Sequence, residues 1–306
     1  VPIVGERVDA HRFLEQVVAM GAAAVFTSEH ELEDISAEKA GEAAWIRVDD
    51  TRAALQRFGS WCRGRLSIPV VGITGSVGKT TTREMIAAAL GAGLRVYKTP
   101  GNSNSQVGVP ITMSQIAPED EIAVIELGMS EPGELTRIAQ VARPTMAVIT
   151  NIGIAHIEQL GSQENILREK LTNQDGLQPG GLLLLNGDDP FLKGAKAREG
   201  FRTLYYGTGE NCHYRAEEVR MENGRPAFTA VCGEKRVPVR LNVLGLHNVS
   251  NAMAALAAAE ESGIPMENAA AALEEFRGFQ HRQQIFEKDG KVGGQAVLGR
   301  QEIYST

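Results

Sequence analysis

The sequence has few cysteines and no long apolar runs. Only three of its 306 residues are cysteine, and neither the number nor the spacing of Cys62, Cys212 and Cys232 fits a disulfide framework or a zinc site. We therefore expect reduced thiols and a cytoplasmic protein. No apolar run is long enough to span a bilayer and no signal peptide is visible, which argues against membrane insertion.

Positive charge is not in excess either. Lysine and arginine total 31 residues against 38 aspartates and glutamates, which gives a formal net charge of -7. This balance argues against broad binding to nucleic acid or to an anionic membrane. The sequence also shows no Ser-His-Asp or reactive-cysteine signature. What remains is the ordinary composition of an α/β protein that is long enough for about two domains.

The most informative stretch is Val70-Val-Gly-Ile-Thr-Gly-Ser-Val-Gly-Lys-Thr-Thr-Thr82. Residues 70–74 predict a buried parallel strand, and residues 80–90 predict a helix after a loop with two glycines. Such a loop surrounds a polyphosphate with backbone N–H groups, while Lys79 reaches the phosphates and the Thr80 hydroxyl holds magnesium. A tight turn with an incidental lysine is the alternative. The residues expected at the nucleotide are Thr74, Gly75, Ser76, Val77, Gly78, Lys79, Thr80 and Thr81.

The rest of the chain repeats strand, loop and helix segments. Residues 67–290 predict a mostly parallel, doubly wound α/β domain like that of a P-loop ATPase, with a small antiparallel ribbon around an Asn-Gly turn at 223–224. Residues 1–66 predict part of a small α/β domain, with the boundary near Leu66. Residues 291–306 are left unassigned. Because the chain starts at Val1 without methionine, we expect a fragment.

Polar residues follow two other predicted strands. Glu126 lies at the end of the apolar run 122–127, where a carboxylate is costly unless it is paired or ligates a cation. An exposed acid at the strand end is the alternative. His156 follows the strand predicted at 146–150, on the same side as Lys79, and is a candidate ligand, although a lone histidine is more often structural. Residues 99–110 are turn formers and suit a ligand-binding loop.

Three further residues lie in segments predicted to be helical. Asn248 and Asn251 are three positions apart near the start of an alanine-rich helix, so they share one face and can present amides to a base. Helix capping is the alternative. Lys170 falls within a helix predicted at 163–177, and composition alone places it on a solvated face.

With these motifs in order, the sequence resembles the Mur ligase family over roughly residues 5–286. A loop with Gly-Asn-Ser-Asn followed by Gly-Val-Pro points to the members that add D-alanyl-D-alanine rather than a single amino acid. The motifs that carry the resemblance are Thr74-Gly-Ser-Val-Gly-Lys-Thr80, Gly101-Asn-Ser-Asn104, Gly108-Val-Pro110, Glu126-Leu-Gly-Met129, Thr150-Asn-Ile-Gly-Ile-Ala-His156 and His247-Asn-Val-Ser-Asn251.

The resemblance implies roles for individual residues. Thr80 and Glu126 would hold a first magnesium ion between the β- and γ-phosphates of ATP, and His156 would bind a second. Lys170 aligns with a lysine that is carbamylated in relatives, where the new carboxylate supports the second ion. The other implied contacts are Asn248, Asn251 and Arg282 at the nucleotide, and Asn102 and Asn104 at the substrate.

The implied activity is ATP-dependent amide bond formation in peptidoglycan precursor synthesis. The γ-phosphoryl group would pass to the terminal carboxylate of UDP-N-acetylmuramoyl-tripeptide, and the amine of D-alanyl-D-alanine would attack the acyl phosphate. Magnesium ions and Lys79 would neutralise the approaching anions, so no protein nucleophile is needed. We expect a monomer with mobile domains. A sibling amino-acid ligase and a non-catalytic nucleotide-binding module are the alternatives.

The resemblance ends before the chain does. Residues 291–306 match no part of the family pattern, so we expect that the C-terminal domain, which the resemblance implies for the incoming amino component, lies outside this sequence. We expect the same of the beginning of the UDP-binding domain. We therefore expect that this fragment binds ATP and is itself inactive as a ligase.

Overall fold

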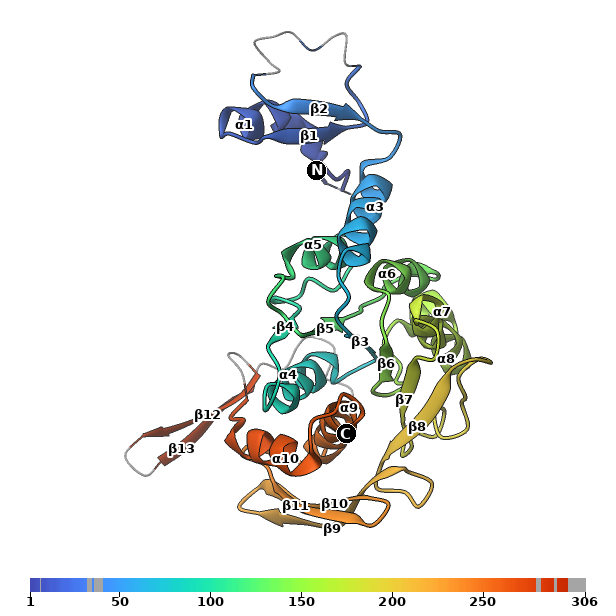
Figure 1. Cartoon of the computed structure of the whole chain (residues 1–306), viewed down its shortest axis with the longest axis vertical. Coiled ribbons are helices and arrows are strands. Elements are labelled where there is room, and N and C mark those ends of the chain that lie inside the picture. Colours follow the sequence, from blue (N-terminus) through green and yellow to red (C-terminus); the bar gives the residue numbers. More distant parts are fainter. Residues whose placement is uncertain (6, 32–34, 36–40, 279–281, 289–290, 297–306) are drawn as a thin grey trace.

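A mostly parallel nine-stranded sheet forms the centre of the molecule (Figure 1). The computed structural model describes residues 1–5, 7–31, 35, 41–278, 282–288 and 291–296. Four neighbouring strands of the sheet are wholly buried, as their continuous apolar sequences predict. They are β3 (Val70–Thr74), β5 (Ile122–Glu126), β6 (Met146–Ile149) and β7 (Leu182–Asn186).

Two more parallel strands extend this group, β4 (Val96–Lys98) beside β5 and β8 (Arg202–Gly207) beside β7. The order is β4-β5-β3-β6-β7-β8, and every neighbouring pair is parallel. The carboxyl ends of parallel strands share one edge, so the residues that follow β3, β5 and β6 gather there. The predicted parallel α/β sheet is confirmed.

An antiparallel ribbon continues the same sheet beyond β8. Its strands are β9 (Tyr214–Glu222), β10 (Arg225–Cys232) and β11 (Lys235–Arg240), and β9 starts as a parallel neighbour of β8. The turn at Asn223 and Gly224 has positive φ at both residues, as tight hairpin turns require. The ribbon predicted from this Asn-Gly turn is therefore part of the central sheet.

Helices cover both faces of the sheet because successive strand residues point to opposite faces. Val71 and Ile73 pack on one face, against α4 (Lys79–Leu90), α9 (Asn248–Glu261) and α10 (Met266–Glu275). Val70 packs on the other face. The elements on that face are α5 (Gly108–Gln115), α6 (Glu134–Ala142), α7 (Ile157–Leu160), α8 (Gln163–Leu171) and the 3-10 helix η3 (Thr172–Gly176).

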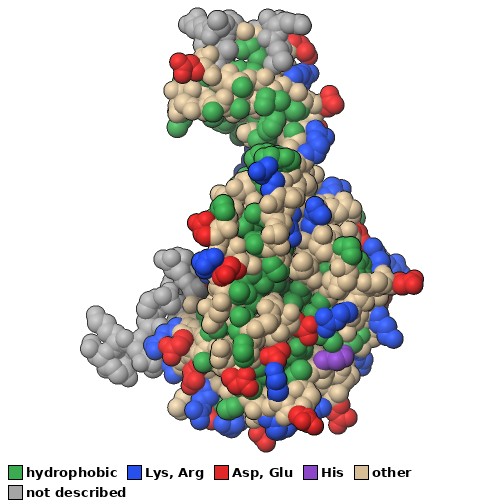
Figure 2. Space-filling model, viewed as in Figure 1, with side chains coloured by type: hydrophobic (Ala, Val, Ile, Leu, Met, Phe, Trp, Pro, Cys, Tyr) green, Lys and Arg blue, Asp and Glu red, His purple; other side chains and the backbone are tan. Residues whose placement is uncertain are grey.

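The N-terminal residues form a small unit at one end of the molecule (Figures 1 and 2). It contains η1 (Ala10–Phe13), α1 (Leu14–Ala19) and a parallel strand pair, β1 (Ala24–Thr27) with β2 (Ala44–Arg47). The helix α3 (Thr51–Gly64) then leads towards β3 and packs against α5 and α6. Its contact with α5 is so close at Gly59 that a Cβ there would lie 2.5 Å from the Cα of Pro110.

Two helices lie where the sequence predicts loops, one beginning within residues 99–110 and one within residues 151–158. α5 begins at Gly108, inside the stretch 99–110, because the proline at position 110 falls in the first turn, where its missing N–H is tolerated. The short helix α7 follows the loop after β6. The helix predicted at 163–177 ends earlier, at Leu171, and continues as the 3-10 helix η3.

The end of the described chain is a hairpin. β12 (Arg282–Lys288) pairs antiparallel with β13 (Lys291–Ala296), so the first residues of the unassigned segment 291–306 pair with the strand before them. Residues 297–306 lie outside the described part. Within the described ranges, no helix has both the length and the apolar character needed to cross a bilayer. On the face in Figure 2, acidic and basic side chains are interspersed.

Candidate active site

The glycine loop joins β3 to α4 at the carboxyl edge of the sheet. Gly75 lies against the segment that follows β6, and a Cβ on it would stand 1.8 Å from Thr150 Oγ1, so no larger residue fits. Gly78 precedes α4 in the left-handed conformation, with φ of 80°, and no side chain caps the helix. The uncapped first turn presents its backbone N–H groups as an anion site.

Lys79 is folded over this loop. Its Nζ donates to the carbonyl oxygens of Gly75 at 2.8 Å and Ser76 at 3.4 Å. The ammonium group therefore lies within the loop that a triphosphate would occupy.

The segment after β6 fixes the shape of the glycine loop. The backbone N–H of Ser76 donates to the carbonyl of Asn151 at 3.1 Å, and that of Val77 donates to Asn151 Oδ1 at 3.0 Å. Thr150 Oγ1 donates to the carbonyl of Val77 at 2.7 Å, and the N–H of Gly153 donates to Ser76 Oγ at 2.8 Å. The Thr-Asn-Ile-Gly segment thus supports the loop through main-chain and side-chain contacts.

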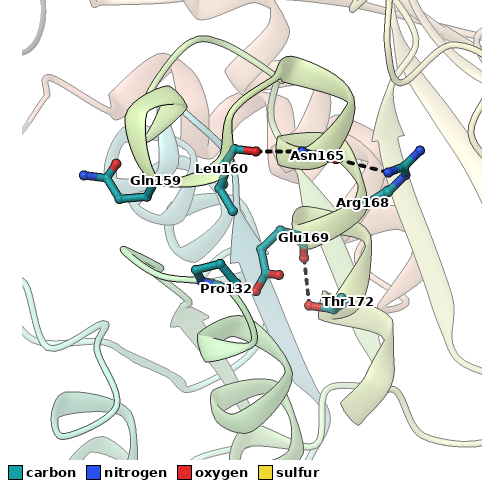
Figure 3. Close-up of a pocket in the computed structure, with 7 residues that line it drawn as sticks. All are labelled: Pro132, Gln159, Leu160, Asn165, Arg168, Glu169 and Thr172. Atoms are coloured by element: carbon teal, nitrogen blue, oxygen red, sulfur yellow. Dashed lines mark hydrogen bonds between the residues drawn. The ribbon is translucent and has the colours of Figure 1, made fainter.

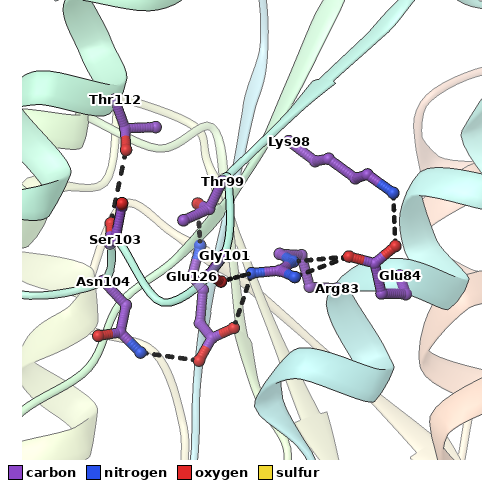
Figure 4. A network of polar contacts seen from close by, with 9 residues as sticks. All are labelled: Arg83, Glu84, Lys98, Thr99, Gly101, Ser103, Asn104, Thr112 and Glu126. Atoms are coloured by element: carbon purple, nitrogen blue, oxygen red, sulfur yellow. Dashed lines mark hydrogen bonds and ion pairs between the residues drawn. The ribbon is translucent and has the colours of Figure 1, made fainter. Parts of the chain in front are cut away.

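Glu126 is buried at the end of β5, with 2% of its surface exposed. Its Oε2 forms an ion pair with Arg83 Nη1 at 3.2 Å, and its Oε1 accepts a hydrogen bond from Asn104 Nδ2 at 2.9 Å (Figure 4). This excludes the alternative of an exposed acid at the strand end. The carboxylate is paired, as its burial requires.

Arg83, Glu84 and Lys98 were not expected at the site, yet they connect to Glu126. Arg83 Nη2 pairs with Glu84 Oε1 at 2.7 Å, and Lys98 Nζ pairs with Glu84 Oε2 at 2.5 Å. Arg83 and Glu84 are buried on α4, after three threonines and directly before the apolar run Met85–Leu90. An adjacent arginine and glutamate at the start of the apolar half of the helix is the sequence signal that could have identified this pair.

Lys170 is almost completely buried on α8, with 1% of its surface exposed. The solvated face that composition alone suggests is therefore wrong. Burial, and to a smaller extent the positive charge of Lys79, lower the pKa of the Lys170 amine to about 7, while Glu169 acts in the opposite direction. A large share of the Lys170 side chains is therefore neutral near pH 7.

His156 lies at the start of α7 with a positive φ of 65°. Its imidazole pKa is lowered by burial first and then by the charges of Lys170 and Lys79, and Glu134 opposes this shift. The three basic groups are thus close enough to affect one another's ionisation, at the edge where β3 and β6 end. A neutral imidazole is the form that ligates a metal ion.

The asparagines of α9 reach α4 through hydrogen bonds. Asn251 Oδ1 accepts from Thr82 Oγ1 at 3.0 Å, and Asn251 Nδ2 donates to Asn248 Oδ1 at 2.9 Å. A Cβ on Gly78 would lie 3.4 Å from Asn251 Oδ1, which places this amide beside the glycine loop. The alanine-rich helix, which the sequence predicts at residues 252–262, begins earlier as α9 at Asn248, and its N-cap residue, His247, makes no side-chain cap hydrogen bond.

Among the expected residues, Asn102 is not brought to these groups, and the Arg282 prediction is not tested. Asn102 lies in the same loop as Asn104, but its side chain is exposed, while Asn104 contacts Glu126. Arg282 begins β12, and its side chain lies outside the described part of the structure.

A separate cavity of about 290 Å³ lies between α7, α8 and the turn before α6 (Figure 3). Glu169 borders it and accepts a hydrogen bond from the backbone N–H of Gly133 at 2.8 Å. None of the residues expected at the site lines this cavity. Its lining residues are Pro132, Gln159, Leu160, Asn165, Arg168, Glu169 and Thr172.

Comparisons with known proteins support the motif-based resemblance. A family model described as the Mur ligase middle domain matches residues 73–259. The UDP-N-acetylmuramoyl-tripeptide--D-alanyl-D-alanine ligase of Bacillus subtilis (strain 168) is 42% identical over 274 residues, which cover 89% of this chain and 58% of the relative. The chain therefore spans somewhat over half the length of that relative.

Solved structures give the same result. MurF from Acinetobacter baumannii matches with a TM-score of 0.85 and 32% identity, covering 96% of this chain and 63% of the other. MurF ligase from Thermotoga maritima in complex with ADP matches with a TM-score of 0.83 and 25% identity, covering 95% of this chain and 66% of the other. The family predicted from the motifs is confirmed: the chain belongs to the Mur ligase family.

Proposed function

We propose that this chain forms the ATP-binding core of a ligase that joins D-alanyl-D-alanine to UDP-N-acetylmuramoyl-tripeptide in peptidoglycan synthesis. One observation carries the proposal. Lys79, His156 and Lys170 are gathered beside an uncapped helix N-terminus, at the edge of the sheet where Glu126 also ends its strand. The similarity to D-alanyl-D-alanine ligases over 89% of the chain supports the choice of substrates.

The glycine loop would bind the triphosphate of ATP. Residues 74–81 supply small side chains and backbone N–H groups, and Lys79 would exchange its carbonyl partners in the loop for phosphate oxygens. Asn248, Asn251 and Arg282 would contact the adenosine part. The ADP in the Thermotoga maritima relative supports a nucleotide at this fold.

Two magnesium ions fit the donor groups at this edge. Thr80 and Glu126 would hold one, since each carboxylate oxygen of Glu126 has one protein partner and retains a further lone pair. His156 and a carbamylated Lys170 would hold the other. The ions would supply charge neutralisation between the triphosphate and the substrate carboxylate.

Carbamylation would use the neutral form of Lys170. The amine nitrogen attacks the carbon of CO₂, a C–N bond forms, and one amine proton leaves to solvent, which gives a carbamate anion. The lowered pKa of Lys170, to about 7, favours this step because the charged ammonium has no lone pair to donate. The product replaces a buried cation by an oxygen ligand.

The remaining assignments follow from the same family. Asn102 and Asn104 would orient the tripeptide carboxylate. Residues 1–66 would belong to the UDP-sugar-binding domain, and residues 67–290 would form the ATP-binding domain. We propose a monomeric cytoplasmic enzyme that acts on small molecules and binds neither nucleic acid nor membrane.

Phosphate release tests this function. The full-length gene product is assayed with magnesium, ATP and UDP-N-acetylmuramoyl-tripeptide, with and without D-alanyl-D-alanine. Release that requires the dipeptide supports the proposal. Release with single amino acids instead would move the assignment to a sibling ligase, and no release with any acceptor would favour a non-catalytic nucleotide-binding module.

A further inference from the structure

A connected network of charged groups surrounds Glu126 (Figure 4). Its centre is Arg83, which is 4% exposed and lies on α4 one turn after Lys79. The guanidinium pairs with Glu126 Oε2 at 3.2 Å and with Glu84 Oε1 at 2.7 Å, and it donates to the carbonyl of Gly101 at 2.9 Å. One side chain thus joins the helix after the glycine loop to β5 and to the loop after β4.

The charges in this network balance. Two carboxylates, Glu84 and Glu126, face two cations, Arg83 and the half-exposed Lys98, whose Nζ lies 2.5 Å from Glu84 Oε2. A buried carboxylate without such partners is costly. The planar guanidinium satisfies both acids at once, which a lysine ammonium does less well because it lacks the rigid fork of donors.

The same arginine also determines where the loop after β4 lies. Gly101 is held by Arg83 through its carbonyl, and Asn104 is held through Glu126 Oε1 at 2.9 Å. The backbone N–H of Glu126 also donates to Thr99 Oγ1 at 2.9 Å. The orientation of the Glu126 carboxylate and the position of residues 99–104 therefore depend on one another.

We propose that Arg83 is a positioning residue that holds the Glu126 carboxylate and the 99–104 loop in a single arrangement, ready for the cation and the acyl substrate. The inference rests on the proposed function, in which Glu126 is a magnesium ligand. Arg83 acts through Glu126 and Gly101, and Lys98 supports it through Glu84. Partners that orient a metal ligand typically change metal affinity ten- to a hundredfold when removed.

Nucleotide binding by this chain tests the proposal without requiring ligase activity. Isothermal titration with ADP, with and without magnesium, gives the gain in affinity that the ion provides. In Arg83→Met we expect this gain to fall about tenfold or more, while binding of ADP alone is retained because the glycine loop and Lys79 are unchanged. Arg83→Lys keeps the charge without the fork and should recover part of the gain.

The control variant is Arg95→Met. Arg95 is an exposed arginine whose guanidinium lies 3.7 Å from Glu121 and donates to the carbonyl of Glu119, all at the surface, so the gain from magnesium should be unchanged. Amide hydrogen exchange adds a readout that does not involve nucleotide. Residues 99–107 should exchange faster in Arg83→Met than in Arg95→Met.

Lys98→Met keeps the test usable if Arg83→Met does not fold, since Lys98 is half exposed and its loss leaves Arg83 in place. We expect a smaller loss of the magnesium gain in the same direction. A full magnesium gain in every folded variant of Arg83 and Lys98 overturns the inference alone. Failure of the wild-type chain to bind ADP with magnesium overturns the proposed function, and the inference with it.

Discussion

Two buried charged groups near the carboxyl edge of the sheet have opposite surroundings. Glu126 has a partner for each oxygen, Arg83 on one and Asn104 on the other. Lys170 is as deeply buried, but no described carboxylate lies within ion-pair distance of it, and the nearby charge of Lys79 has the same sign. The protein alone therefore compensates the first group and leaves the second uncompensated.

This difference indicates that Lys170, and not Glu126, is the group that a covalent modification would stabilise. An uncompensated buried amine destabilises the fold and has a lowered pKa, which makes it available as a nucleophile near neutral pH. The site thus has a compensated half, Glu126 with its partners, and an uncompensated half, Lys170. A carbamate at Lys170 would replace the buried cation by an anion near Lys79 and His156. The two halves would then each present one carboxylate to a cation.

The largest effect is expected from Lys79→Ala, because Lys79 lies in the glycine loop and its charge also acts on Lys170 and His156. ATP turnover by the full-length gene product should fall about a thousandfold, since the phosphates lose their main cationic partner. Steady-state phosphate release measures this effect, with Arg95→Met as a surface control. Near-normal turnover would contradict the assignment of the glycine loop.

Glu126→Leu should remove the ion pair with Arg83 that compensates the buried carboxylate. It leaves the buried Arg83 with one carboxylate fewer and should lower the free energy of unfolding by about 3 kcal/mol. Urea denaturation gives the value. The exposed Glu121→Leu is the matched control and should cost much less. Equal costs for the two variants would show that the Arg83–Glu126 pair contributes no more than a surface pair.

Lys170→Ala should impair turnover, because it removes the group of the uncompensated half. Turnover by the full-length gene product should fall roughly ten- to a hundredfold, because the second cation loses a ligand. A short carboxylate such as acetate, added to the assay, should restore part of the rate by entering the space of the missing carbamate. An unimpaired variant would reduce Lys170 to a structural residue.

Lys170→Met should have the smallest effect and the opposite sign on stability. In buffer free of CO₂ it should stabilise the chain by on the order of 2 kcal/mol at pH 7, because an apolar side chain replaces an uncompensated charge. The pKa of Lys170 falls from 10.5 to about 7 on folding. Between these values the unfolded chain binds the extra proton, so wild-type stability rises with pH and the advantage of the variant shrinks.

Urea denaturation at several pH values between 7 and 10.5 measures this trend. Lys193→Met, which replaces an exposed lysine, should show no comparable pH-dependent advantage. An advantage of Lys170→Met that stays constant with pH would contradict the lowered pKa.

The sequence predicts the elements better than the contacts between them. The apolar run 182–186 and the periodic segment 134–142 match β7 and α6, because buried strands and amphipathic helices have local signatures. The order of strands, loops and helices also places the residues after β3, β5 and β6 at one edge. Those parts of the site follow from local sequence.

Two features depend on tertiary packing and could not be predicted in the same way. Arg83 and Glu126 are 43 positions apart and meet only because α4 packs beside β5. Lys170 shares the buried side of α8 with Ile166, one turn earlier, but a lysine in a helix usually faces solvent, so composition alone misses its burial. The start of α5 was not predicted, because its first residues include Gly108 and Pro110, which are also typical of turns.

The most direct test of the contrast between the two groups is carbon-13 NMR of the chain in labelled bicarbonate. We expect a carbamate resonance in the wild type and in Lys193→Met that is absent in Lys170→Met. The resonance should weaken as the pH is lowered below 7, where Lys170 becomes protonated. A spectrum without any resonance that depends on Lys170 would contradict carbamylation of this buried amine.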